Sequence, residues 1–104
     1  SFSSDVSPAT SNMPLANFES MDNNFRRRYG PRYQPLGLSN DVMGGQPCAL
    51  WTFTLHGKDG WFLKKVDRDA LFNGNEYALL CVAPEGDFNI YQPTFDRAYA
   101  SFHF

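Results

Sequence analysis

The chain has 104 residues, of which 16% are aromatic, and its nine basic and eleven acidic side chains give a formal net charge of −2. This length holds one domain at most, and the near-neutral charge argues against a general nucleic-acid binder, which would carry a clear basic excess. No apolar run approaches the roughly 20 residues that span a bilayer, so we expect no membrane span.

The composition of the chain changes near residue 45. Residues 1–45 are polar and rich in Pro, Gly, Ser and Asn, whereas residues 46–104 hold most of the aromatic and β-forming side chains. We therefore predict an N-terminal arm over residues 1–45 and a compact β domain over residues 46–104. A domain of about 60 residues buries only about 60% of its unfolded surface. We expect the arm, a ligand or a partner to complete it.

One amphipathic helix is predicted within the arm, over residues 17–29. Its apolar side chains recur every three or four residues and therefore share one face. These residues are Phe18, Met21, Phe25 and Tyr29. Asn17 is a suitable N-cap, and Gly30 followed by Pro31 ends the helix. We expect the apolar face to dock on the chain's own core or on a partner, and the sequence leaves both open.

Five short strands in mostly antiparallel order are predicted for the second part of the chain, from alternating or continuous apolar runs. They span residues 49–56, 61–66, 77–83, 88–91 and 98–104. Asp67 to Gly74 is predicted to form a single helical turn that Asp67 caps. The predicted fold class is α+β: a mostly antiparallel, five-stranded small sheet or barrel with an N-terminal extended arm and one helix.

Two cysteines, Cys48 and Cys81, fall in predicted strands. They form a disulfide if those strands are neighbours, or else they are buried free thiols. Cys48 with His56 or His103 is the available set for a cysteine-dependent enzyme, which is one alternative function. These few, scattered side chains do not have the spacing of a zinc site, and no cofactor is predicted.

Residues 74–82 resemble the strand that carries the catalytic histidine in papain-like viral leader proteases. Tyr77 stands where that histidine would be, so the resemblance does not imply a catalytic role for this position. Because the chain begins at Ser1 without Met, we also expect a processed chain, such as an organellar, secreted or viral polyprotein product, of unknown location.

The sharpest local signal is the Arg- and Tyr-rich stretch at the end of the predicted helix. Arg and Tyr are enriched at interfaces, and Arg binds carboxylate or phosphate bidentately. We therefore predict a non-catalytic interaction or structural subunit that docks on a larger protein assembly through its N-terminal arm. The predicted partner-binding residues are Phe18, Met21, Phe25, Arg26, Arg27, Arg28, Tyr29, Arg32 and Tyr33.

A small carbohydrate-binding β module is a further alternative. In that case exposed aromatic rings would stack on a glycan, and the candidates are Trp51, Trp61 and Tyr91. The near-neutral charge favours a protein partner over nucleic acid.

Overall fold

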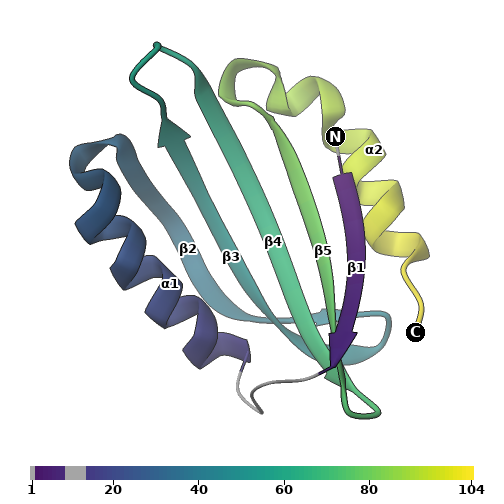
Figure 1. The fold of residues 1–104 in the computed structure, drawn as a ribbon. Coiled ribbons are helices and arrows are strands. Elements are labelled where there is room, and N and C mark those ends of the chain that lie inside the picture. Colours follow the sequence, from purple (N-terminus) through teal and green to yellow (C-terminus); the bar gives the residue numbers. More distant parts are fainter. Residues whose placement is uncertain (1, 9–13) are drawn as a thin grey trace.

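The computed structural model describes residues 2–8 and 14–104. In this part of the chain, five antiparallel strands form one sheet in the order β1-β5-β4-β3-β2, and two helices pack on it (Figure 1). The elements are β1 (Phe2–Pro8), α1 (Pro14–Tyr29), η1 (Gly30–Arg32), β2 (Tyr33–Met43), β3 (Gln46–His56), β4 (Phe62–Phe72), β5 (Asn75–Pro84), η2 (Glu85–Asp87) and α2 (Phe88–Ser101). The predicted α+β class with a five-stranded antiparallel sheet is confirmed.

The composition change near residue 45 does not separate an arm from a domain. Gly44 and Gly45 form the tight turn of the β2–β3 hairpin, with φ of 58° and 79°, a conformation that costs glycine little. The first part of the chain supplies both edge strands, because β1 pairs with β5 and β2 pairs with β3. Edge strands commonly carry polar residues and proline. For this reason the sequences of β1 and β2 have the composition of a loop.

Helix α1 begins at Pro14, three residues before the predicted start at Asn17. Proline suits the first turn of a helix, because its missing N–H would have no partner there. Asn17 consequently lies inside α1 and does not cap it. The predicted end at Tyr29 is confirmed, and Gly30 takes a φ of 55° directly after it.

Residues 88–101 form α2 in place of the strands predicted over 88–91 and 98–104. Phe88 and Phe95, each 3% exposed, face the sheet from one side of this helix. The alternation from Ala98 onward is so short that it fits a helical period as well as a strand period. Pro93 lies inside the helix, and α2 bends near its start (Figure 1), as proline generally causes.

The segment from Asp67 to Gly74 is not a helical turn. Strand β4 continues to Phe72, and Asn73 and Gly74, with φ of 51° and 78°, connect it to β5. Asn-Gly is the preferred sequence of a two-residue hairpin turn, because both positions require positive φ. Asp67 is therefore a strand residue and caps no helix.

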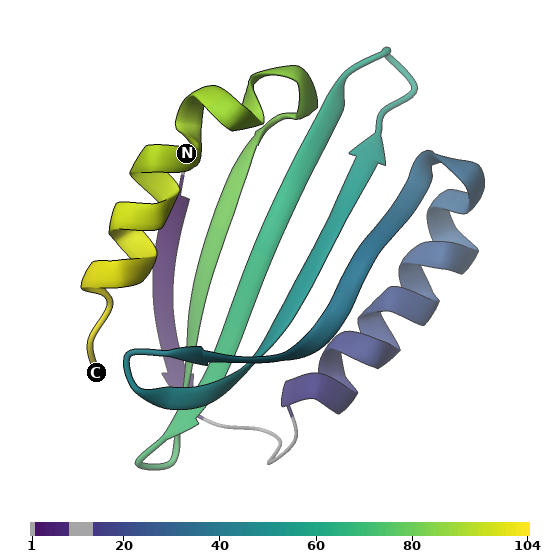
Figure 2. The ribbon, with the colours of Figure 1, turned by 180° about the vertical axis from the view of Figure 1, so that it is seen from behind.

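The two helices cover opposite faces of the sheet at opposite edges (Figures 1 and 2). The buried cluster under α1 contains Phe18, Tyr33, Ala49, Trp51, Phe53 and Leu55. The buried cluster under α2 contains Met43, Cys48, Ala70, Leu79, Cys81, Ala83, Phe88 and Phe95. Side chains alternate between faces along a strand, so β3 contributes to both clusters. Each helix leaves part of its own face without a helical cover.

Cys48 and Cys81 are free and buried. Strand β4 lies between them, where Cys48 pairs with Ala70 and Cys81 pairs with Val66. With strands about 4.8 Å apart and a rise of about 3.3 Å per residue, their Cα atoms lie about 16 Å apart. A disulfide requires a Cα separation below about 7 Å, so the disulfide alternative is excluded by this register.

No helix in the described part of the chain is both long enough and apolar enough to cross a membrane.

Candidate functional site

A buried hydrogen-bond chain fixes α1 to the sheet. Trp51 Nε1 donates to the hydroxyl of Tyr33 at 3.0 Å, and that hydroxyl donates to Asp22 on α1. Asp22 also accepts a hydrogen bond from Arg26 Nε at 3.0 Å. Burial, together with the hydrogen bond to Asp22, raises the pKa of Tyr33 to about 12. The phenol therefore remains a proton donor at neutral pH.

Three of the predicted partner-binding residues belong to the core under α1. Phe18 and Tyr33 are only 4% and 3% exposed, and Phe25 packs edge-on against Tyr33 and Phe53, with ring centroids 5.6 Å apart in both cases. These residues hold α1 on its own sheet, so they are not available as surface contacts.

The remaining predicted residues lie on α1 and η1, and Tyr29 among them packs against the core under α1. Met21 and three arginines are exposed, whereas Tyr29 and Arg32 are half-buried. We call Arg26, Arg27, Arg28 and Arg32 the basic end of α1. Cations are favoured in the last turn of a helix because they complement its dipole.

The side chains of the basic end are held in place. The guanidinium carbons of Arg28 and Arg32 lie 5.3 and 5.6 Å from the ring centroid of Tyr29, within the range of a cation–π contact. Arg27 hydrogen-bonds the neutral side chain of Asn24. Among the described residues, Arg26 is the only member of the basic end that pairs with a carboxylate. The other three charges remain available to an external anion.

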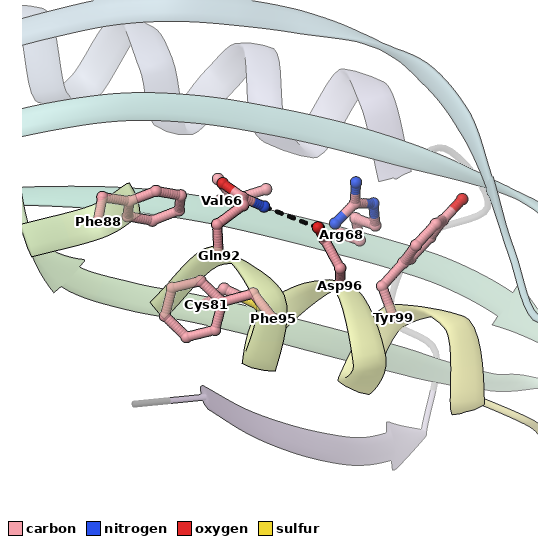
Figure 3. A pocket seen from close by; sticks show the side chains of 8 residues that line it. All are labelled: Val66, Arg68, Cys81, Phe88, Gln92, Phe95, Asp96 and Tyr99. Carbon is pink, nitrogen blue, oxygen red and sulfur yellow. Dashed lines mark hydrogen bonds between the residues drawn. The ribbon is translucent and has the colours of Figure 1, made fainter. Parts of the chain in front are cut away.

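A small pocket lies between α2 and the sheet, around Arg68 (Figure 3). Arg68 Nε donates to Asp41 Oδ2 at 3.0 Å, and its guanidinium lies 4.1 Å from the ring centroid of Tyr99. The pocket has a volume of about 50 Å³, far below the roughly 300–1,000 Å³ of small-molecule sites. Arg68 therefore acts as a structural link between the β2–β3 hairpin, the sheet and α2.

The proposed pair of Cys48 and His56 does not come together. Both residues lie on the extended strand β3, eight positions apart, which places them about 26 Å from each other. His56 Nε2 lies 3.3 Å from Glu85 Oε2 at its own end of the strand. Burial raises the pKa of Cys48 to about 11, whereas nucleophilic catalysis requires the thiolate.

The three aromatic candidates for sugar stacking differ in exposure. Trp51 is 1% exposed and lies in the core under α1, whereas Trp61 and Tyr91 are 42% and 43% exposed. The Trp61 ring covers Gly57, where an added Cβ would lie only 1.8 Å from the indole. Trp51 is therefore unavailable to a glycan, and Trp61 packs on its own turn.

A group of carboxylates on β4 and β5 was not among the predicted partner-binding residues. Asp67, Asp69 and Glu76 face the same side of the sheet as α1, because Asp67 pairs with Trp51 and Asp69 with Ala49. Burial raises the pKa of Asp67 to about 6. Burial and a hydrogen bond with Glu76 raise the pKa of Asp69 to about 8. Asp67 and Asp69 therefore titrate near neutral pH.

Comparisons with known proteins agree with this fold. No curated protein matches the sequence. A solved structure from Pseudomonas aeruginosa, the protein of unknown function PA94 described as a putative regulator, has a TM-score of 0.74 at 11% identity, and the match covers 97% of this chain and 69% of that chain. Residues 3–104 match the family model described as "Serine/threonine kinase C-terminal domain". The chain therefore belongs to the family of serine/threonine kinase C-terminal domains.

Proposed function

We propose that this protein is a non-catalytic interaction domain that binds an acidic surface of a protein partner through the basic end of α1. The observation that carries the proposal is the anchoring of this cluster. Two arginines flank the ring of Tyr29, and that ring packs edge-on against Phe25 at a centroid distance of 5.3 Å. Because the cations are held before a partner arrives, less side-chain entropy is lost on binding.

The chemistry of the cluster favours carboxylates as the ligand. Guanidinium groups form paired hydrogen bonds with carboxylates, and three members of the basic end have no carboxylate partner among the described residues. The family assignment is consistent with a binding or regulatory role beside a kinase. In such a protein, the domain would select or hold a partner while the chemistry occurs elsewhere.

A fluorescently labelled peptide of ten glutamates tests the proposal. We expect the wild-type domain to bind the peptide in anisotropy titrations, with an affinity that falls as salt screens the charges. Arg27→Glu combined with Arg28→Glu should weaken binding at least tenfold, because both side chains are exposed and leave the core intact. Arg97→Glu, an exposed charge reversal on α2, is the matched control. Equal binding by the wild type and the double variant would overturn the proposal.

A further inference from the structure

The face of the sheet that carries α1 is only partly covered. Helix α1 lies mainly over β2 and β3 and makes a small contact with β4, and α2 lies behind the opposite edge. Most of β4, together with β5 and β1, therefore has no described helix over it on this face (Figure 1). We call this region the open sheet half. Its side chains follow from the strand register, because paired residues point to the same side.

The open sheet half is acidic. Asp69 on β4 pairs with Ala78 on β5, which in turn pairs with Asp5 on β1. Asp67 and Glu76 lie two residues away from Asp69 and Ala78 on the same face. We call Asp5, Asp67, Asp69 and Glu76 the acidic patch. Adjacent strands are about 4.8 Å apart and the rise along a strand is about 3.3 Å per residue, so the patch extends about 10 Å across the strands and about 13 Å along them, around the small side chain of Ala78.

One oxygen of the acidic patch has no compensating donor. Asp69 is only 6% exposed, and its Oδ1 has no hydrogen-bond partner among the described residues. Buried polar atoms are generally hydrogen-bonded, so an unpaired one requires an explanation. A hydrogen-bond donor from outside the chain would satisfy this oxygen. Lys65, on the same face, lies against the ring of Phe53, with Nζ 5.9 Å from its centroid.

The basic end and the acidic patch cannot neutralise each other within one molecule. The basic end lies beside Tyr33, which pairs with Leu55, and Leu55 in turn pairs with Leu63 at the start of β4. Asp69 lies six residues further along β4, a distance of about 20 Å. Charges are largely screened beyond about 8–10 Å at physiological ionic strength. Each molecule therefore presents two clusters of opposite net charge on one face. Within them, Asp22 offsets only Arg26, and Lys65 lies near Asp67.

We propose that the partner bound by the basic end of α1 is a second copy of this chain, and that the second copy binds through its acidic patch. This inference rests on the proposed function and names its partner. The charge complementarity of two clusters on one face selects this occupant. Guanidinium groups of one copy would approach the carboxylates of Asp5, Asp67 and Glu76 in the other, which are exposed or half-buried.

A two-fold axis allows both contacts to form at once. Suppose that two copies meet face to face. A two-fold axis that lies in the contact plane, and that is perpendicular to the line from the basic end to the acidic patch of one copy, then places each basic end opposite an acidic patch. The same residues are then used by both copies, as in closed homodimers. Helix α1 of each copy would lie over the open sheet half of the other, which covers the part of the face that lacks a helix of its own.

Sedimentation equilibrium with charge-reversed variants tests the dimer. One variant, Arg27→Glu with Arg28→Glu, leaves two arginines and two glutamates in the basic end and so removes its net charge. The other, Asp5→Lys with Glu76→Lys, removes the net charge of the acidic patch and leaves Asp67 and Asp69 unchanged. We expect the wild type to dimerise, and each variant alone to dimerise at least tenfold more weakly. An equimolar mixture of the two variants should form heterodimers. One of its two reciprocal contacts keeps the wild-type charges, and the other places the introduced glutamates opposite the introduced lysines.

Two controls separate this dimer from other associations. Arg97→Glu and Asp59→Lys change exposed charges on α2 and in the β3–β4 turn, and they should dimerise like the wild type. The inference would be overturned if the wild type stayed monomeric at millimolar concentration. It would also be overturned if the charge-reversed variants dimerised as strongly as the wild type, or if the mixture of the two variants stayed monomeric. If the monomer still binds the glutamate peptide through its basic end, the proposed function survives. If the wild-type protein binds neither a second copy of itself nor the glutamate peptide, both proposals fail.

Discussion

The hydroxyl of Tyr33 accepts a hydrogen bond from Trp51 Nε1 at 3.0 Å. Trp51 is 1% exposed and Tyr33 is 3% exposed, so this contact lies fully inside the core under α1. The same hydroxyl donates to Asp22. One oxygen atom thus joins β2, β3 and α1, and its partner Asp22 also accepts a hydrogen bond from Arg26 of the basic end.

Removal of this oxygen should destabilise the fold. Tyr33→Phe leaves the indole N–H of Trp51 and one carboxylate oxygen of Asp22 without their partner. We expect a loss of about 1–3 kcal/mol in the free energy of unfolding, the usual cost of an unsatisfied buried group. Urea unfolding followed by tryptophan fluorescence measures it. Tyr91→Phe, at a residue 43% exposed, should change stability by less than about 0.5 kcal/mol; similar losses in both variants would contradict the network.

Asp69 should make stability depend on pH. The pKa of Asp69 is raised to about 8 in the folded state, whereas an unfolded Asp titrates near 3.9. The folded state therefore holds a proton that the unfolded state releases, so this contribution is complete below about pH 4 and is lost as pH rises to about 8. Asp69→Asn cannot ionise, and it should raise the melting temperature at pH 8 more than at pH 5.

The control for the pH experiment is Asp59→Asn, an exposed residue in the β3–β4 turn. Its melting temperature should follow that of the wild type at both pH values. If Asp69→Asn shifted the melting temperature by the same amount at pH 5 and pH 8, the raised pKa of Asp69 would be refuted.

The two glycines of the β2–β3 turn should respond differently to alanine. Both have positive φ, which costs an alanine roughly 1–2 kcal/mol. A Cβ on Gly44 would also lie 3.0 Å from Phe104 Cε2 and 3.2 Å from Phe102 Cδ1, whereas a Cβ on Gly45 meets nothing within 4 Å. We expect Gly44→Ala to cost about 1–3 kcal/mol more than Gly45→Ala. Equal losses in chemical denaturation would show that the turn does not pack against the C-terminal phenylalanines.

The two thiols should be unreactive in the folded protein. Burial raises the pKa of both Cys48 and Cys81, and the thiolate is the reactive form. We expect slow modification by a chromogenic disulfide reagent under native conditions and rapid modification of both thiols in urea. Ser20→Cys introduces an exposed thiol on α1 and should react quickly in the folded state. Rapid native reaction of the wild type would show that its thiols are not enclosed.

The sequence was most informative where apolar residues recurred with one helical or strand period over several turns or residue pairs. The stripe that includes Phe18 and Phe25 predicted α1, and the alternation around Trp51 predicted β3; both elements are present. It was least informative for the edge strands. β2 is largely exposed and contains Pro35 and Gly37 beside a register irregularity, so its composition is that of a loop. Pairing with β3 overrides this local preference.

The candidate surfaces were predictable only in part. The basic end is contiguous in sequence and was recognised from its arginines. The acidic patch, by contrast, draws Asp5 and Glu76 from strands that meet only through β5 pairing with β1. Such a group has no signature until the strand order is known. The contact between Asp41 and Arg68 could not be predicted either, because these residues lie on strands separated by β3 and the strand order was not known.

The place of β1 in the sheet has a consequence for folding. Strands β2 to β5 form a continuous meander in which each strand pairs with the next along the chain, whereas Phe2 pairs with Cys81. Contacts between residues so distant in sequence require closure of a long loop and form late. We therefore expect β1 to join a sheet that already exists, and its amide protons to exchange with solvent through a local opening that leaves the meander folded.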